Sequence, residues 1–295
     1  MSVRQLGYIR FEASSLDDWE DFLGDLLDGA RVLREGDQLL LQVDSMFARL
    51  IIEQGPADDM TALGWEVTDH RSLAAVAERA EAAGFAVKHA TDAERAAGKV
   101  LGLIFVDDPS GIRNEIFYGP IYDDQRTLER SLAGRFLAGS LGAGHAAVFC
   151  DPADYDACVN FYRDVLELAI VGRREVEDLT MGIPITMYRC NRRQHSLGLV
   201  PMVSPTGKRL AHCSVEYMDI DDLGRAHDAA VERDIVMMSL GRHQADGTVS
   251  FYAKTPAGFE MEIGWDSRLV PEDMAIEQYR PVRGPSVWGH KRESF

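Results

Sequence analysis

The feature that most constrains the fold of this chain is a pattern of elements that occurs four times. In each unit a strand is followed by an amphipathic helix and then by further strand-like segments. The opening strands are predicted at residues 5–11, 63–67, from 143, and at 212–218. Repetition at this length is typical of a fold assembled from one supersecondary unit. The sequence therefore predicts an α+β fold made of four β-α-β-β-β units.

The helix of the first unit carries the clearest local pattern. Ser15 is the predicted N-cap, and apolar residues follow at the spacing of one helix face: Trp19, Phe22, Leu23 and Leu26. The second unit repeats this spacing and closes at Gly84, and the third has a predicted helix at 153–166. Shorter strands are predicted at 38–43, 48–53, 85–88 and 101–106.

The repeat is interrupted once, by residues 119–142. This stretch is charged, irregular and contains several glycines, as a linker between domains does. We therefore predict two domains of two units each, residues 1–135 and 136–295.

Aligning the two halves reveals a difference in residue type at three positions. The turn Asp108-Pro109-Ser110-Gly111 matches Thr255-Pro256-Ala257-Gly258, which pairs Glu115 with Glu262. The opening strands pair two further positions with histidines: Tyr8 with His145, and Ala62 with His212. The second half thus has two histidines and a glutamate where the first half has a glutamate alone. This contrast predicts a metal site in residues 136–295 and none in residues 1–135.

Two histidines and one carboxylate leave three adjacent coordination positions open, as in non-haem Fe(II) oxygenases. The ligands His145, His212 and Glu262 are too far apart in the sequence for a short zinc motif such as HExxH. The predicted metal is Fe(II), with Mn(II) as an alternative, because oxygen and imidazole ligands do not separate the two.

Charge and composition exclude several classes of protein. The 295 residues carry a formal net charge of −17, which disfavours binding to nucleic acid or to anionic membranes. No apolar run has the length of a membrane span, and the N-terminus does not resemble a secretory signal. The four cysteines show no CxxC spacing, so reduced thiols and a cytoplasmic location are expected.

A motif near the C-terminus resembles a known family. Residues 239–265 contain Gly241-Arg242-His243, Asp246, Ser250-Phe251-Tyr252 and the turn that leads to Glu262. This pattern resembles the C-terminal signature of type I extradiol ring-cleavage dioxygenases, especially the group of the 2,3-dihydroxybiphenyl 1,2-dioxygenases. The repeated unit likewise resembles the vicinal-oxygen-chelate fold, in which two units form a half-open barrel around a metal. Two such barrels are therefore expected.

The resemblance implies roles for further residues. His195 matches the acid–base histidine of the family, although Gln194 stands where many members have a second histidine. His243 and Tyr252 match the residues that hydrogen-bond a substrate oxygen, and Asp246 is expected to orient His243. Met187 and Val200 are candidate apolar pocket residues by rough position. The segment 285–290 resembles the C-terminal segment of the family and is assigned to packing or the pocket rim.

The implied reaction is insertion of both atoms of O2 beside the two hydroxyl-bearing carbons of a catechol, giving a yellow dienoate. The length and tail favour a bicyclic or aryl-substituted catechol in aromatic degradation. A homo-oligomer of up to eight chains is expected. Two alternatives share the fold. One is a glyoxalase-like metal isomerase or lyase, which would not need His195, His243 and Tyr252 together. The other is a metal-free small-molecule binding protein, which would not need the ligand triad.

Overall fold

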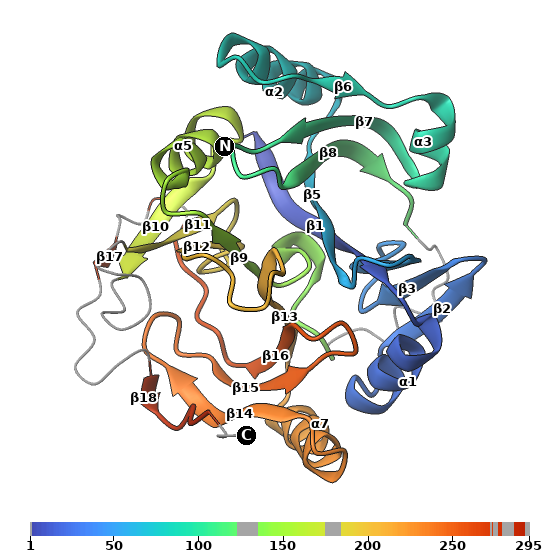
Figure 1. Ribbon diagram of the computed structural model, residues 1–295, viewed down its shortest axis with the longest axis vertical. Helices are drawn as coiled ribbons and strands as arrows, with labels where there is room; N and C mark the ends of the chain where they lie inside the picture. The colour runs from blue at the N-terminus through green and yellow to red at the C-terminus, as the bar shows by residue number, and fades with distance from the viewer. Residues whose placement is uncertain are drawn as a thin grey trace.

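A computed structural model describes residues 2–122, 135–174, 184–271, 273, 277–278 and 286–292. Their strands form two mixed sheets, one from each half of the sequence, which lie side by side with helices at two ends (Figure 1). The α+β fold of four repeated units is confirmed. The predicted boundary between the domains falls after residues 123–134, which lie outside the described residues, so the domain limits stay a prediction.

The N-terminal sheet has eight strands in the order β2-β3-β4-β1-β5-β8-β7-β6. Its first unit consists of β1 (Val3–Ala13), α1 (Leu16–Leu26), β2 (Arg31–Glu35), β3 (Gln38–Gln42) and β4 (Leu50–Gln54). Its second unit consists of β5 (Asp59–Val67), α2 (His70–Ala82), β6 (Lys88–His89), α3 (Asp92–Ala97), β7 (Val100–Asp107) and β8 (Arg113–Pro120).

The C-terminal sheet has ten strands in the order β17-β10-β11-β12-β9-β13-β16-β15-β14-β18. After the short helix η1 (Gly139–Leu141), the third unit consists of β9 (Ala146–Cys150), α5 (Tyr155–Asn160), η2 (Phe161–Val165), β10 (Ala169–Arg174), β11 (Ile185–Arg189) and β12 (Leu197–Pro201). The fourth consists of β13 (Leu210–Tyr217), α7 (Ile220–Glu232), β14 (Val236–His243), β15 (Val249–Lys254) and β16 (Glu260–Trp265), followed by β17 (Glu277–Gln278) and β18 (Ser286–Trp288).

The two sheets are built by the same rule. The first and last strands of each unit pair in parallel: β1 with β4, β5 with β8, β9 with β12, and β13 with β16. The two units of a sheet then join through their first strands, β1 with β5 and β9 with β13, in antiparallel pairs. The first strand of every unit is therefore central, and residues at the start of each repeat meet at the middle of a sheet.

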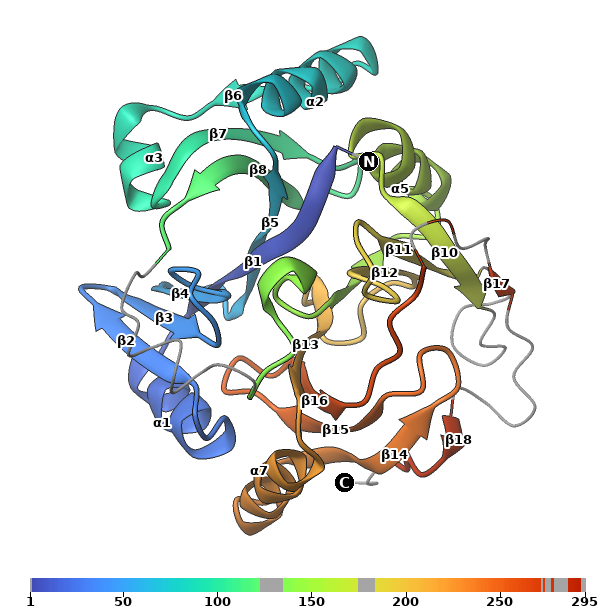
Figure 2. The same ribbon diagram turned by 180° about the vertical axis from the view of Figure 1, so that it is seen from behind.

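Helices of the two halves meet at two places. Contacts connect α1 with α7, which lie side by side in both views (Figures 1 and 2), and α2 with η2. One hydrophobic core extends across this junction, where the ring of Phe259 stacks on Phe11 at 5.1 Å between centroids. Each sheet thus buries its helix-covered face and leaves its other face for a site.

Ser15 caps α1 by accepting a hydrogen bond from the amide of Asp18, as predicted. The helix predicted at 153–166 is divided into α5 and the π-helical η2, and the strand predicted at 85–88 is reduced to Lys88–His89. Strand β2 and helix α3 were not expected. In the part of the chain that the structure describes, no helix is long and apolar enough to span a membrane.

Candidate metal centre

The alternation of strand side chains places the predicted ligands on the face opposite the helices. On β13, Cys213 and Val215 pack in the hydrophobic core, so His212 points to the opposite face of the sheet. On β16, Met261 packs in the same core, and Glu262 therefore also points away from the helices. The parallel pairing of β13 with β16 brings these two strands side by side.

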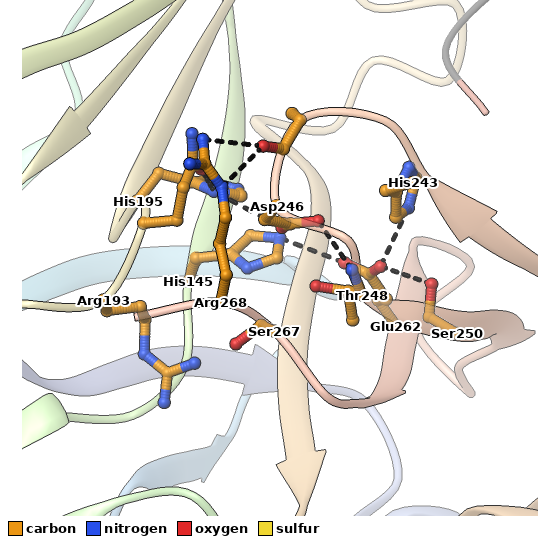
Figure 3. Close-up of polar contacts among 12 residues, drawn as sticks. His145, Arg193, His195, His243, Asp246, Thr248, Ser250, Glu262, Ser267 and Arg268 are labelled. Carbon is orange, nitrogen blue, oxygen red and sulfur yellow. Dashed lines mark hydrogen bonds and ion pairs between the residues drawn. The ribbon is translucent and has the colours of Figure 1, made fainter. Parts of the chain in front are cut away.

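His145, His212 and Glu262 converge at the centre of the C-terminal sheet. One potential ligand atom from each residue lies within 4.8 Å of the other two. Nε2 of His145 is 3.1 Å from Nε2 of His212 and 3.1 Å from Oε2 of Glu262, and the His212–Glu262 distance is 3.7 Å. His145 directly precedes β9, so each ligand comes from a strand at the middle of the sheet (Figure 3 labels His145 and Glu262).

The donor chemistry of this cluster fits a divalent cation. Glu262 is 1% exposed. Its Oε1 accepts a hydrogen bond from Ser250 Oγ at 2.7 Å and forms a second hydrogen bond with His243 Nε2 at 3.0 Å. Its Oε2 is left facing the two imidazoles. Two imidazoles with facing nitrogens and a buried carboxylate oxygen are ligand types that first-row metals accept.

Burial and neighbouring groups keep these ligands in the protonation states that metal binding needs. Burial lowers the pKa of His212 to about 3, so its imidazole is neutral at pH 7. Burial raises the pKa of the Glu262 carboxyl, but hydrogen bonds from His145 and His243 outweigh this effect and bring the pKa well below its usual range. His212 thus offers a neutral nitrogen and Glu262 an ionised oxygen.

His195 lies against the ligand cluster. Its ring centroid is 4.1 Å from that of His145, and its Nδ1 is 2.6 Å from Oε1 of Gln194. Asp246, which is 5% exposed, has Oδ2 3.8 Å from the same Nδ1 (Figure 3). Burial, followed by the neighbouring His145, lowers the pKa of His195 to about 3, so the imidazole is neutral at pH 7.

His243 and Tyr252 lie on the other side of Glu262. Nε2 of His243 is 2.9 Å from the hydroxyl of Tyr252 and 3.0 Å from Oε1 of Glu262. Burial raises the pKa of Tyr252 well above its usual value, so the hydroxyl remains a hydrogen-bond donor. The ion-pair contact of Asp246 is to His195, whereas its expected role of orienting His243 stays a prediction.

Two further residues lie beside the cluster: Ser250, to which the sequence motif assigned no role, and His290, in the segment 285–290 that was assigned to packing or the pocket rim. Ser250 contacts Glu262 directly, and its hydroxyl lies 3.2 Å from Nε2 of His290 in the C-terminal tail. The ring of His290 lies 4.1 Å from that of His243. The alternation of β15 could have indicated Ser250, because Ser250 and Tyr252 share a face, but the position of the tail depends on long-range packing.

The N-terminal sheet shows what occupies the equivalent place. Gly64 pairs with Glu115 as Ser214 pairs with Glu262, and Arg10 pairs with Ala62 as Ala147 pairs with His212. Arg10 and Ala147 thus occupy equivalent positions, and the residues two places before them, Tyr8 and His145, correspond as the sequence alignment predicts. The hydroxyl of Tyr8 donates to Oε2 of Glu115 at 2.6 Å, and Nε of Arg10 lies 3.4 Å from that oxygen. A guanidinium thus compensates the buried carboxylate.

The loop before the last strand differs in the same way. Arg193, Gln194 and His195 precede β12, and the equivalent residues before β4 are Met46, Phe47 and Ala48. The first set faces a polar cavity beside His145, whereas the second set packs with Tyr8 in an apolar cluster. At these loop positions the C-terminal half thus has polar side chains beside the cluster, and the N-terminal half has apolar ones.

Met187 and Val200 have the orientation that a pocket residue requires. Tyr188 on β11 and Leu199 on β12 pack in the main core, so their neighbours Met187 and Val200 point to the opposite face of the sheet. Met187 is 5% exposed and packs with Val171 and Ala245 in a small apolar cluster. Contact with a substrate stays a prediction.

Comparison with known proteins identifies the family. Residues 142–263 match the Glyoxalase/Bleomycin resistance protein/Dioxygenase superfamily, and residues 6–55 match the first domain of the dihydroxybiphenyl dioxygenase BphC family. A solved structure of a catechol 2,3-dioxygenase is similar to this chain, with a TM-score of 0.87 and 32% identity over 100% of this chain and 97% of that one.

Two relatives extend this similarity over nearly the whole sequence. A biphenyl-2,3-diol 1,2-dioxygenase of Metapseudomonas furukawaii is 36% identical over 99% of this chain and 94% of its own length. An iron-dependent extradiol dioxygenase of Rhodococcus jostii is 33% identical over 98% of this chain and 97% of its own length. With this similarity and this fold, the chain belongs to the extradiol dioxygenase family of the vicinal-oxygen-chelate superfamily.

Proposed function

We propose that this protein is an Fe(II)-dependent extradiol dioxygenase that cleaves a bicyclic or aryl-substituted catechol with O2. The observation that carries the proposal is the convergence of His145, His212 and Glu262 within 4.8 Å, beside three groups suited to proton transfer and hydrogen bonding. Those three ligands would hold the iron, with one carboxylate oxygen of Glu262 directed at it. When bound, the iron supplies a binding site for both catechol oxygens and O2.

The protein's own residues would supply proton transfer and orientation. His195 is neutral at pH 7, so its imidazole can accept a proton from a catechol hydroxyl and return it later. The Tyr252 hydroxyl stays protonated and can donate to a substrate oxygen, and His243 at 2.9 Å from that hydroxyl holds it in place. Asp246, 3.8 Å from His195, would stabilise the imidazolium that forms.

The size of the substrate follows from the relatives and from the apolar side of the sheet. One relative bears the name of a biphenyl-2,3-diol dioxygenase. Met187 and Val200 lie on the face of the sheet that carries the ligands, where they would contact the second ring of such a substrate. The product would be a yellow dienoate that further reactions of aromatic degradation consume.

We also propose a cytoplasmic location for the protein. The four cysteines are buried free thiols, which agrees with a reducing cytoplasmic environment. We expect a homo-oligomer of up to eight chains, and Mn(II) in place of Fe(II) as the alternative metal. A glyoxalase-like isomerase or a metal-free binding protein is disfavoured, because neither needs His195, His243 and Tyr252 around one ligand cluster.

The test is oxygen uptake by iron-loaded, reduced protein with four catechols: 2,3-dihydroxybiphenyl, a dihydroxynaphthalene, a steroid catechol and catechol itself. We expect the highest kcat/KM with 2,3-dihydroxybiphenyl or the fused-ring catechol, together with a yellow product. Removal of iron with a chelator should abolish uptake, and re-addition of Fe(II) should restore it. No uptake with any of the four would exclude the dioxygenase.

A further inference from the structure

A buried ion pair lies directly behind the ligand cluster. Nη1 of Arg193 is 2.6 Å from Oε2 of Glu216, and the two residues are 3% and 4% exposed. The Arg193 side chain points away from His195 and His145 (Figure 3), and its guanidinium contacts Glu216 instead. The pair therefore needs an explanation other than substrate binding.

The hydrogen bonds of this pair connect separate segments of the chain. Arg193 donates from Nε to the carbonyl of Leu141 at 3.2 Å and from Nη2 to the carbonyl of Leu137 at 2.5 Å. Glu216 accepts from the amide of Ser267 at 2.8 Å and from its hydroxyl at 2.7 Å. The pair thus ties the segment before β9 to the loop before β12, to β13 and to the loop after β16.

Each of these segments carries a residue of the site. His195 follows Arg193 by two positions in the same loop, while Glu216 is on the strand of His212, and Ser267 follows the strand of Glu262. Arg193 and Glu216 also line one small polar cavity together with His145 and His195. A change in the pair would therefore displace the His195 loop relative to the ligand strands.

Stability alone is a weak reason for such a pair. Removing two charges from water costs about as much as their attraction returns, so a buried ion pair adds little net stability but can fix one arrangement of the chain. We propose that Arg193 and Glu216 are positioning residues that hold the His195 imidazole at its working distance from the ligand cluster. The inference rests on the acid–base role proposed for His195.

The N-terminal sheet provides a matched control. Arg49 is 2% exposed and also lies in the loop before the last strand of a unit, where it donates to the carbonyls of Gly7 and Gly139. It also pairs with Asp44 at 2.5 Å. Arg49 is therefore buried like Arg193 and likewise bonds two carbonyls and one carboxylate. Its loop, however, precedes β4 in the N-terminal half, which lacks the ligand triad.

The experiment compares Arg193→Lys with Arg49→Lys, using 2,3-dihydroxybiphenyl as substrate. Lysine keeps the charge but cannot reproduce the planar fork of five donors. A displacement of about 1 Å at a reacting group can cost about 10²-fold in rate. We expect Arg193→Lys to retain its iron and to change the dissociation constant of anaerobic substrate binding less than threefold. Its kcat should fall by about 10²-fold. Arg49→Lys should lower Tm and leave kcat within threefold.

A double variant separates positioning from general damage. If Arg193 acts through His195, Arg193→Lys combined with His195→Asn should be no slower than His195→Asn alone, because the group to be positioned is gone.

The outcomes distinguish the two proposals. If His195→Asn does not slow turnover, the acid–base role fails and the positioning inference fails with it. If His195→Asn slows turnover but the two changes multiply in the double variant, the acid–base role survives and the positioning inference is overturned. Should Arg193→Lys not fold, Ser267→Ala decides, since it removes one hydrogen bond to Glu216: a fall in kcat with normal iron content supports the inference, and an unchanged kcat overturns it.

Discussion

At the scale of single residues, burial and hydrogen bonds together set the protonation states of the groups in the site. Tyr252, His195 and Glu262 are ordinary residue types, but their surroundings fix a protonated phenol, a neutral imidazole and an ionised carboxylate at pH 7. Each of these states is the one that its proposed role requires. The same residue types on an exposed strand would have no such fixed states.

Removing the Tyr252 hydroxyl should weaken catalysis without removing the metal. A hydrogen bond to a charged group is worth about 1.5–3 kcal/mol, so kcat/KM of Tyr252→Phe should fall roughly 10- to 100-fold with unchanged iron content. Tyr155→Phe is the control, because Tyr155 bonds the carbonyl of Pro184 outside the cluster and should retain activity. Equal losses in both variants, measured by oxygen uptake, would argue against a role at the substrate.

The contrast between the two halves predicts that adding two histidines will not create a second metal site in the N-terminal half. Tyr8→His with Ala62→His places the ligand types of the C-terminal half beside Glu115, yet the guanidinium of Arg10 still lies 3.4 Å from that carboxylate. Elemental analysis should therefore find about one iron per chain in the double variant, because a cation already compensates the glutamate. Adding Arg10→Ala should permit a second iron. Two irons per chain without that change would contradict this account of the N-terminal sheet.

At the scale of elements, the repeated unit explains why a ligand is found on the first strand of a repeat. First strands are central in both sheets and pair with each other, so His145 and His212 meet although a whole unit separates them in the sequence. The last strand of a unit pairs in parallel with the first, which adds Glu262. The helices only cover the opposite face.

One helix cap gives a direct test at this scale. Ser15 accepts a hydrogen bond from the amide of Asp18 at 3.2 Å, so Ser15→Ala should lower the free energy of unfolding by about 1 kcal/mol. Ser14→Ala is the control, because the exposed Ser14 precedes the cap and should change stability by less than about 0.5 kcal/mol. Urea unfolding monitored by circular dichroism measures both, and equal effects would show that the cap is unimportant.

At the scale of the whole molecule, the two sheets share one core. The ring of Phe259, from the C-terminal half, lies 5.1 Å from that of Phe11 and 5.8 Å from that of Trp19, both from the N-terminal half. A core of this kind couples the stability of the half with the candidate metal site to that of the other half.

Phe259→Ala should therefore destabilise both halves together. Truncation of a buried phenylalanine costs about 3–5 kcal/mol, and because the cavity opens between the sheets, we expect one unfolding transition at a lower urea concentration. Leu101→Ala, at a residue that is 70% exposed, is the control with little effect. Two separated transitions in Phe259→Ala would show instead that each sheet is stable without the other.

The sequence by itself determined the repeat, the unequal halves and the ligand triad. Each of these depends on residue type at a fixed spacing, and strand alternation then puts His212 and Glu262 on one face. Tertiary structure alone decided the neighbours: Ser250 and His290 beside Glu262 and His243, Arg10 beside Glu115, and the buried pair behind His195. These contacts join segments that no local pattern relates, because they depend on how loops and the tail pack once both sheets have formed.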